Sequence, residues 1–482
     1  MKSRVLFFFL ALVIISLSGF AQVRLPAVIS DGMVLQRNTD AKIWGWADPG
    51  EKVIVRAGWT IEKAETRADK NGEWSVLVPT TNAGGPYNLY IYGSNDIVVK
   101  DIFLGDVWIC SGQSNMEYKI NWMGGWSNPW FEKDSIDIVK KKYPLIRLFQ
   151  FEKNTSETPI SSFKGEWMPV NTETVAEFSA VAFFFGRELN NRIGVPVGLV
   201  STNWGGTPAE AWTSRESLEG NEDLKYYTER DYDSKAEQEK PSRLYNAMIH
   251  PLINMTITGA IWYQGEANRL DALQYRKLFP SMIKDWRKQF NQGDLPFYYV
   301  QIAPYNYDRP MVGALVREAQ MMALDVPGTG MVVTSDIGNP DNIHPVKKQE
   351  VGRRLARIAL ALHYGVKGMI YSGPLFERME IVEIDGIEKA RLFFKHVARG
   401  LESTEGDPRC FEIAGDDRVF HEARAVIEGD NVIVWSDKVS NPVAVRFGFT
   451  NSSQTNLYNS EGLPAAPFRT DDWVVYTGDV EQ

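Results

Sequence analysis

Cysteine is scarce in this 482-residue chain, which contains only Cys110 and Cys410. A fold held together by disulfides needs more cysteines at short spacings, so the sequence excludes a disulfide-rich scaffold. A bond between these two distant cysteines stays open. Because Cys110 lies in an apolar stretch, we expect it to be a buried free thiol.

An excess of basic residues is also absent, since 61 Asp and Glu residues outnumber 52 Lys and Arg residues and give a net charge of −9. This balance argues against nucleic acid as a partner. Histidine is rare as well, with five in the chain. No two of them stand at the close spacing of a metal-binding pair. We therefore expect neither a metal site nor a cofactor.

Long hydrophobic runs are limited to one, from Val5 to Leu17, which follows Met1-Lys2-Ser3-Arg4 and precedes Ser18-Gly19-Phe20-Ala21. The run is shorter than the roughly 20 residues that a membrane span needs. A basic start, an apolar middle and a small final residue are typical of a secretory signal peptide. We expect cleavage near Ala21, a secreted or periplasmic protein, and no membrane attachment after cleavage.

The sequence after the signal peptide changes character twice. Residues 22–100 contain short apolar runs separated by turn sequences such as Asp48-Pro49-Gly50, which predicts an N-terminal β-sandwich domain. Residues 101–365 alternate strand and helix patterns, which predicts a parallel sheet covered by helices on both faces. Residues 366–482 return to hairpin patterns and predict a C-terminal β-rich domain.

The central part carries the clearest element predictions. Strands are expected at residues 102–109, 197–200, 257–262, 297–302 and 330–334, and helices at residues 179–192 and 346–363. The stretch from Glu216 to Ser242 is highly charged and weakly periodic, so we expect a surface excursion there.

Ser114 lies in a small polar run, Cys110-Ser111-Gly112-Gln113-Ser114-Asn115-Met116-Glu117, directly after the strand expected at 102–109. An α/β protein presents a nucleophile in this way at the carboxyl end of a strand. The same run also suits an ordinary strand-to-helix turn in which Ser111 or Ser114 caps the helix. The run by itself does not decide between these two interpretations.

A glycine pair follows the strand that ends near Val200, within Asn203-Trp204-Gly205-Gly206-Thr207-Pro208. Gly205 and Gly206 would let the backbone approach a ligand and point N–H groups at a developing negative charge. An ordinary Gly-Gly turn explains the pair equally well in isolation.

A third run, Trp262-Tyr263-Gln264-Gly265-Glu266-Ala267-Asn268, lies at the end of the strand expected at 257–262. Gln264 could donate a side-chain N–H to an oxyanion. Glu266 could position a substrate hydroxyl, brace the loop, or simply occupy the first turn of a helix.

A fourth run, Asp341-Asn342-Ile343-His344-Pro345, precedes the helix expected at 346–363. An Asp three residues before a His can fold back to accept the Nδ1 hydrogen, which leaves Nε2 free as a base. The same spacing also occurs in turns and in metal-ligand pairs. Together with the three other runs at strand ends, however, it completes a set of nucleophile, base, orienting acid and oxyanion donors.

These four runs resemble the sequence blocks of a known family, the sialate O-acetylesterases, a carbohydrate esterase branch of the SGNH hydrolase superfamily. The matching residues are Gly112-Gln113-Ser114-Asn115-Met116, Trp204-Gly205-Gly206-Thr207, Gln264-Gly265-Glu266 and Asp341-x-x-His344. Gly105-Asp106-Val107-Trp108 and the tail from Asn456 to Thr470 are similar as well. The resemblance implies an SGNH-like α/β/α domain flanked by N-terminal and C-terminal β-rich domains. Met116 separates the chain from the G-x-S-x-G hydrolases.

By this resemblance Ser114 is expected to be the nucleophile, His344 the general acid–base and Asp341 its partner. The implied reaction removes O-acetyl groups from sugars through an acetyl-enzyme, with acetylated sialic acid as the first substrate class. Acetylated xylan and pectin side chains are the alternative substrates.

The resemblance also implies a set of residues that hold the oxyanion or contact the substrate. Besides the Ser114 N–H, they are Gly205, Gln264, Gln113, Gly206 and Glu266. Gln264 stands where the wider superfamily usually has an Asn. The choice between Gly205 and Gly206 as the backbone donor stays open.

Two other functions remain open from the residues. A glycoside hydrolase would pair Glu266 with Glu210 or Asp336 at a separation of about 5–9.5 Å. A non-catalytic glycan-binding protein would rely on the β-domains and the 15 tryptophans. A carboxylate-bearing sugar would need a cation, for which the candidates are Arg215, Arg269 and Arg317. The sequence does not reveal the oligomeric state.

Overall fold

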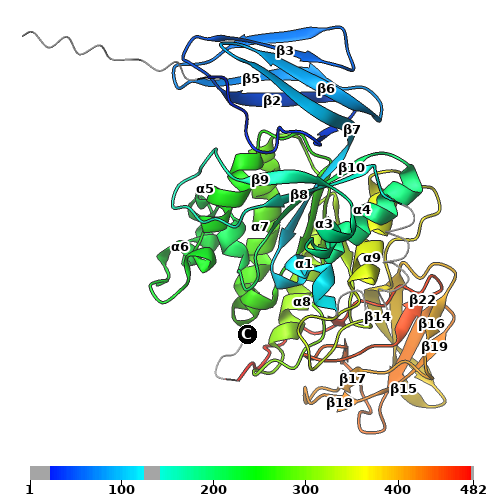
Figure 1. Ribbon diagram of the computed structural model, residues 1–482. Helices are drawn as coiled ribbons and strands as arrows, with labels where there is room; N and C mark the ends of the chain where they lie inside the picture. Colours follow the sequence, from blue (N-terminus) through cyan, green and yellow to red (C-terminus); the bar gives the residue numbers. More distant parts are fainter. Residues whose placement is uncertain (1–21, 124–141, 479–482) are drawn as a thin grey trace, which may run out of the picture.

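The computed structural model describes residues 22–123 and 142–478. The expected signal peptide, residues 1–21, lies outside the described residues. Figure 1 shows three parts in a row: N-terminal strands at one end, a central layer of strands and helices, and a second group of strands at the other end.

The central sheet has the strand order β13-β12-β11-β7-β10-β8-β9. Its strands are β7 (Asp96–Gly112), β8 (Ile146–Phe151), β9 (Gly165–Pro169), β10 (Val197–Asn203), β11 (Gly259–Tyr263), β12 (Phe297–Val300) and β13 (Thr329–Val332). All neighbours pair in parallel except β9, which runs antiparallel to β8 at the edge. The predicted α/β fold with a parallel sheet is confirmed, with one antiparallel edge strand added.

Helices cover both faces of this sheet. Successive residues of a strand point to opposite sides, and in β7 the residues on both sides are apolar and buried. Val107 and Ile109 belong to the same hydrophobic core as α7 (Ala272–Phe290) and α8 (Val312–Met322). Trp108 and Cys110 belong to the opposite core, with α4 (Ala180–Ile193) and α9 (Lys348–Leu362). Helices α4 and α9 begin within two residues of their predicted starts.

Strand β7 joins the N-terminal strands to the central sheet without a break. Its first part pairs antiparallel with β6 (Gly84–Tyr92), and its last part pairs with β10 and β11. The domain boundary predicted after residue 100 falls inside this strand, next to Asp101, whose φ is +56°. The other N-terminal strands are β1 (Val34–Gln36), β2 (Asp40–Trp46), β3 (Lys52–Ala57), β4 (Lys63–Arg67) and β5 (Glu73–Pro79).

The C-terminal strands form a separate hydrophobic core. They include β14 (Leu375–Ile384), β15 (Ile387–Lys395), β19 (Arg424–Glu428) and β20 (Asn431–Trp435), which form one antiparallel sheet, and the pair β17 (Phe411–Ala414) and β21 (Ala444–Phe447). This part contacts the loops that follow β12 and β13. Tyr305 N–H donates to Asn451 O at 3.1 Å, and the Ser335 and Thr455 hydroxyls lie 2.8 Å apart. The C-terminal part therefore supports the loops that lead to His344.

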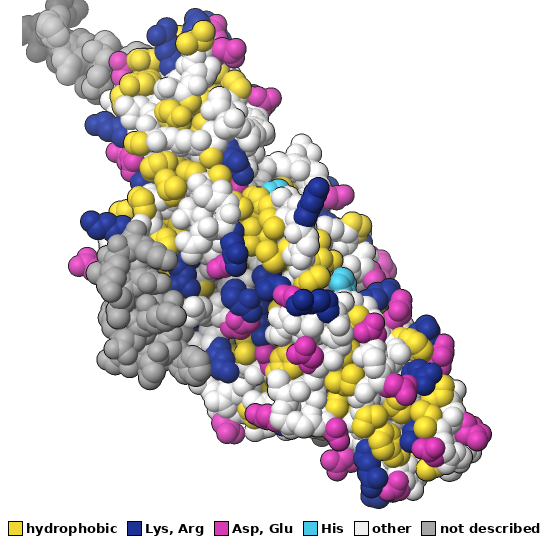
Figure 2. Space-filling view, turned by 90° about the vertical axis from the view of Figure 1, so that its right-hand side faces the viewer, with side chains coloured by type: hydrophobic (Ala, Val, Ile, Leu, Met, Phe, Trp, Pro, Cys, Tyr) yellow, Lys and Arg dark blue, Asp and Glu magenta, His cyan; other side chains and the backbone are white. Residues whose placement is uncertain are grey.

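Several composition-based expectations can be compared with the structure. Both cysteines are free, with Cys110 fully buried and Cys410 partly buried, and burial raises the pKa of Cys110. Acidic and basic side chains are intermixed along the face drawn in Figure 2. Within residues 22–123 and 142–478, no helix combines the length and apolarity needed to cross a bilayer.

The stretch 216–242 is partly different from the expected surface excursion. It contains short helices, including α5 (Arg215–Glu219) and α6 (Tyr226–Glu229), and it buries Leu218, Leu224 and Tyr227. These three side chains anchor an otherwise charged segment to the central core.

Candidate active site

The site forms where three parallel strands end at the same level. Gly112 at the end of β7 pairs with Asn203 of β10 and Tyr263 of β11. Gly112 has a φ of +140°, and a Cβ there would lie 2.2 Å from the Tyr263 carbonyl oxygen, so only glycine fits. The chain then turns into α1 (Ser114–Glu117), which begins with Ser114. Helix α1 lies on the side of the central layer nearer the C-terminal strands (Figure 1).

Ser114 and His344 meet directly, since Ser114 Oγ lies 2.8 Å from His344 Nε2. The His344 backbone N–H donates to the Asn342 side chain at 2.9 Å, which stabilises the loop that carries the ring. Burial, followed by the nearby positive charge of Lys348, lowers the pKa of His344. The imidazole is therefore neutral near pH 7 and suited to accept the serine proton.

Asp341 does not reproduce the expected partnership with His344. Its carboxylate is exposed and accepts a hydrogen bond from Asn306 Nδ2 at 3.4 Å, while its backbone N–H donates to Asn339 at 2.9 Å. Among the contacts of the described residues, no hydrogen bond joins Asp341 to His344. A pairing with Nδ1 would need another side-chain conformation of Asp341.

Gly205, rather than Gly206, lies beside the nucleophile. A Cβ on Gly205 would be 3.3 Å from Ser114 Cβ, whereas a Cβ on Gly206 would meet nothing within 4 Å. The Gly205 N–H already has an acceptor, because it donates to Glu117 Oε2 at 2.6 Å. The other oxygen of Glu117 accepts from Lys153 Nζ at 2.6 Å.

Gln264 is placed differently from the expected oxyanion donor. Its side chain is fully buried, and Nε2 donates to Asn268 Oδ1 at 2.7 Å and to Thr207 O at 3.3 Å. Both amide hydrogens are thereby committed, because one carboxamide nitrogen has two. The amide holds the loop after β11 against the loop after β10. In this structure Gln264 is therefore not the expected oxyanion donor.

Gln113 holds the loop after β11 through its side-chain oxygen. It is buried, and its Oε1 accepts from the backbone N–H groups of Gly265 at 3.3 Å and Ala267 at 3.2 Å. These bonds connect the nucleophile turn to the loop that carries Glu266.

The carboxylates that a glycoside hydrolase would use are each bound to other side chains. Glu266 and Glu210 are each 3% exposed, and burial raises the pKa of both, for Glu210 to about 7. Glu266 accepts from Asn115, whereas Glu210 accepts from Asn268 at 2.8 Å. Asp336 is bound by both terminal nitrogens of Arg354, at 2.8 and 2.7 Å.

The three arginine candidates for a substrate carboxylate differ in their surroundings. Arg215 pairs with Glu219 on the surface of α5 at 2.6 Å. Arg269 donates to the Glu266 carbonyl at 3.3 Å, and fully buried Arg317 donates to the Asn451 carbonyl at 3.3 Å. The geometry therefore gives no support to a carboxylate clamp on Arg215 or Arg317. Arg269, in contrast, follows Glu266 in the loop after β11, and its Nε has no hydrogen-bond partner among the described residues.

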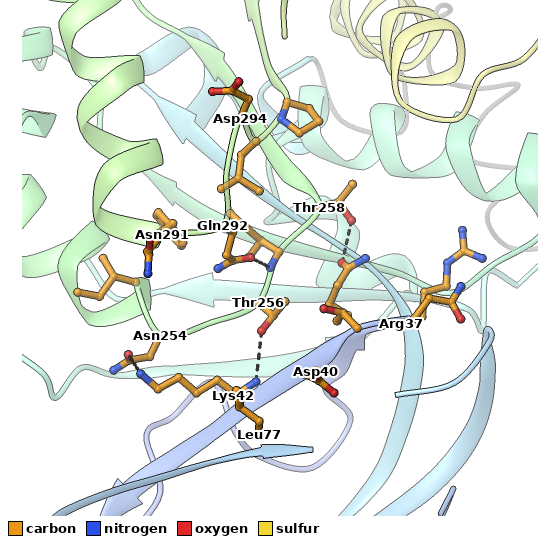
Figure 3. A pocket seen from close by; sticks show the side chains of 18 of the residues that line it. Arg37, Asp40, Lys42, Leu77, Asn254, Thr256, Thr258, Asn291, Gln292 and Asp294 are labelled. Atoms are coloured by element: carbon orange, nitrogen blue, oxygen red, sulfur yellow. Dashed lines mark hydrogen bonds between the residues drawn. The ribbon is translucent and has the colours of Figure 1, made fainter. Parts of the chain in front are cut away.

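A separate cavity of about 890 Å³ lies between the N-terminal strands and the central domain (Figure 3). Its lining includes Thr256 and Thr258 before β11 and Asp294 before β12, which places it at the amino ends of these strands. Lys42 N–H donates to Thr256 Oγ1 at 3.3 Å, and Thr258 Oγ1 donates to Gln36 at 2.8 Å. These bonds join the two parts of the chain at the end of the sheet opposite to Ser114.

Three residues of the site were not recognised in the sequence: Asn115, Glu117 and Lys348. Glu117 lies three residues after Ser114, on the same face of α1. Lys348 precedes Val351 and Leu355 by three and seven residues, which is the spacing of the buried face of α9. A lysine in register with an apolar face is the feature that could have revealed it.

An α/β protein with a serine hydroxyl next to a histidine at this sheet edge has the form of a serine hydrolase. The family described as "Carbohydrate esterase, sialic acid-specific acetylesterase" matches residues 104–361. Sialate O-acetylesterases from Pongo abelii and Homo sapiens are each 30% identical to the chain, with 92% of this chain and 92% of the relative covered. A carbohydrate acetylesterase from Xanthomonas citri is 38% identical, with a TM-score of 0.84 over 94% of this chain and 100% of that chain.

The chain belongs to this carbohydrate esterase family, and the protein is an ester hydrolase. The predicted resemblance is thereby confirmed, and so is the predicted enzyme class. Membership of this family argues against the two alternative hypotheses, a glycoside hydrolase and a non-catalytic glycan-binding protein.

Proposed function

We propose that the protein removes O-acetyl groups from sugars, with O-acetylated sialic acid as the first substrate class. Ser114 is the nucleophile and His344 the general acid–base. The observation that carries this proposal is the 2.8 Å approach of Ser114 Oγ to His344 Nε2. The substrate class is taken from the names of the sialate O-acetylesterases that the chain resembles.

The reaction follows from the two side chains. His344 Nε2 takes the proton of Ser114 as Oγ attacks the acetyl carbonyl, and the protonated imidazole then gives that proton to the leaving sugar oxygen. Water attacks the acetyl-enzyme with His344 again as the base, and acetate leaves. Asp341 remains the proposed partner of His344 on sequence grounds, in a conformation that releases it from Asn306.

The developing oxyanion needs donors on the side of Ser114 that faces Gly205. Ser114 is the first residue of α1, so its N–H has no acceptor within the helix. Gly205 N–H is the second proposed donor, and it becomes available when Glu117 releases it. Gly206 is the less suitable candidate because it lies farther from Ser114.

The test is acetate release by the purified protein from O-acetylated sialic acid and from acetylated xylan, with Ser114→Ala as the control. We expect release from acetylated sialic acid and none from the variant. Release from xylan alone would move the substrate to plant polysaccharides. An active Ser114→Ala protein would refute the serine mechanism.

Export and domain division are further parts of the proposal. The basic and apolar composition of residues 1–21 supports a signal peptide cleaved near Ala21, which N-terminal sequencing of the exported protein would test. The proposed divisions at 100/101 and 365/366 are tested by limited proteolysis. We expect resistance near residue 100, because β7 is continuous there, and earlier cleavage in the connection before β14.

A further inference from the structure

Asn115 lies directly after the nucleophile and connects three segments of the site. Its Nδ2 donates to Glu266 Oε1 at 2.6 Å and to the Ile343 carbonyl at 3.0 Å. Its Oδ1 accepts from Lys348 Nζ. The side chain is fully buried, so all three bonds are protected from water. One amide thus joins the turn after β7, the loop after β11 and the loop that carries His344.

Lys348 is the most unusual member of this group because it is a fully buried lysine. Its ammonium lies 4.9 Å from the Tyr118 ring centroid and 5.4 Å from that of Tyr263, and aromatic faces attract a cation. Burial lowers the pKa of Lys348 to about 7, and the charge of Glu266 opposes that change. Lys348 also lies four residues after His344, at the start of α9.

We propose that Asn115, Lys348 and Glu266 are positioning residues that hold the His344 loop against the nucleophile turn. This inference rests on the proposed roles of Ser114 and His344. Asn115 donates a hydrogen bond to the Ile343 carbonyl, immediately before His344. The Lys348 ammonium and the Glu266 carboxylate together determine the orientation of the Asn115 amide. An amide turned by 180° would face a cation with its N–H group and a carboxylate with its oxygen.

Burying Asn115, Lys348 and Glu266 costs free energy of folding, which argues that these residues have a role beyond packing. Burying a lysine and a glutamate removes both from water, and apolar residues of similar size often stabilise a core better. In addition, Glu266 Oε2 is buried without a hydrogen-bond partner. Such expensive arrangements concentrate at functional sites.

Lys348 also acts on His344 through its charge. The groups facing the imidazole are the Ser114 hydroxyl from α1, the ring of Tyr118 directly after α1, and Lys348 from α9, with Asp341 in the same loop. Of these, Lys348 lowers the pKa of His344. When His344 titrates, below pH 7, Lys348 is still largely protonated. Removing that charge must therefore raise the pKa of His344 and shift the acidic limb of the kcat/KM profile to higher pH.

The first experiment compares Lys348→Met with Lys347→Met, the same change at the exposed neighbouring position. The His344 pKa is read from the imidazole resonances by NMR and from the pH dependence of kcat/KM for an aryl acetate. We expect an upward shift of about half a pH unit or more in Lys348→Met and none in Lys347→Met. Lys348→Gln, which keeps an N–H donor toward Asn115 but no charge, should show the same pKa shift with a smaller loss of kcat.

The second experiment separates positioning from folding. Asn115→Ala should lower kcat roughly 10- to 100-fold, with KM nearly unchanged, because Asn115 is buried and does not contact the substrate. Glu266→Gln keeps an oxygen that accepts from Asn115 and should retain more activity than Glu266→Leu. Melting temperatures of all variants are measured alongside.

The outcomes distinguish this inference from the proposed function. If Lys348→Met and Asn115→Ala are less stable yet keep the wild-type kcat and His344 pKa, the group is merely structural and the inference is wrong. If Lys348→Met does not fold, Lys348→Gln and the two Glu266 variants decide by the same criteria. If wild type and Ser114→Ala are equally inactive, the proposed function fails, while the NMR shift still reports the coupling of Lys348 to His344.

Discussion

Glu117 competes with the oxyanion for the N–H of Gly205, and this competition predicts an unusual gain of activity. The carboxylate of Glu117 accepts that N–H at 2.6 Å and is held by Lys153, also at 2.6 Å. If Gly205 is an oxyanion donor, Glu117 must release it before the acetyl carbonyl is attacked. Part of the activation barrier is then the free energy of breaking the bond between Gly205 and Glu117.

The size of the effect follows from the difference between charged and neutral acceptors. A hydrogen bond to a charged group contributes about 1.5–3 kcal/mol and a neutral one about 1 kcal/mol. Glu117→Gln should therefore weaken the competing bond by roughly 1 kcal/mol. Since about 1.4 kcal/mol corresponds to a tenfold change, we expect kcat/KM to rise by about fivefold.

The assay is steady-state hydrolysis of an aryl acetate at pH 7, with Glu152→Gln as the matched control. Glu152 is exposed and pairs with Lys164 at 3.6 Å on the surface, so the same change of charge there should leave kcat/KM unaltered. A tenfold or greater fall in Glu117→Gln, with an unchanged melting temperature, would refute this reasoning. It would mean that the carboxylate takes part in turnover.

Four further predictions concern the same site and the two cysteines. Gly205→Ala should lower kcat at least about tenfold, because the new Cβ would contact Ser114. Gly206→Ala, at a φ of +79°, should cost about 1 kcal/mol of stability and little activity. Steady-state kinetics and thermal melts distinguish the two variants. Asp341→Asn should lower kcat by about tenfold, less than the roughly 10⁴ for a buried triad aspartate because its carboxylate is exposed, and an unchanged kcat would refute the proposed partnership with His344. The acidic limb of kcat/KM should fall below pH ~6.5, the ordinary pKa of histidine, since burial lowers the pKa of His344; a limb above pH 7 would contradict the assignment. Thiol titration without reductant should find two thiols after denaturation and an unreactive Cys110 before it.

The parallel sheet was predictable because its strands are bounded by strong local patterns. The run up to Ile109 and the stretch 257–262 are apolar and end in polar residues, so β7 and β11 were found within a few residues of their observed carboxyl ends. The amino end of β7 was placed wrongly, because Asp101 has the φ of a turn yet lies inside a continuous strand. Local patterns do not show that a strand can pass through such a residue when both its halves are paired.

Helix α7 was overlooked although it has 19 residues. Pro280 lies inside it, and proline ordinarily ends or kinks a helix. The apolar face of α7 contributes Tyr275, Phe279 and Trp286 to the core shared with β11 and β12. Tertiary packing thus maintains a helix that local propensity argues against.

The strand ends that carry the candidate residues could be predicted from local patterns, but the direction of the Gln264 side chain could not. Gln264 was expected to face the substrate, and it faces Asn268 and Thr207 instead. A polar residue after a strand can point into the active-site cleft or back between two loops. The sequence contains no local feature that distinguishes these two directions, because the partner of Gln264 is four residues away on one side and far away on the other.

The buried polar groups around Ser114 explain how separate loops can present one geometry. Gln113 binds the loop after β11, Gln264 connects that loop to the one after β10, and Asn115 binds the loop of His344. Each bond joins segments that are far apart in the sequence and that the central sheet brings together. The nucleophile and the base therefore reach 2.8 Å only as a result of the complete fold. A substitution of Gln113, Gln264 or Asn115 should consequently lower kcat more than it weakens substrate binding. It would alter the distance between Ser114 and His344 while leaving the surface of the site intact.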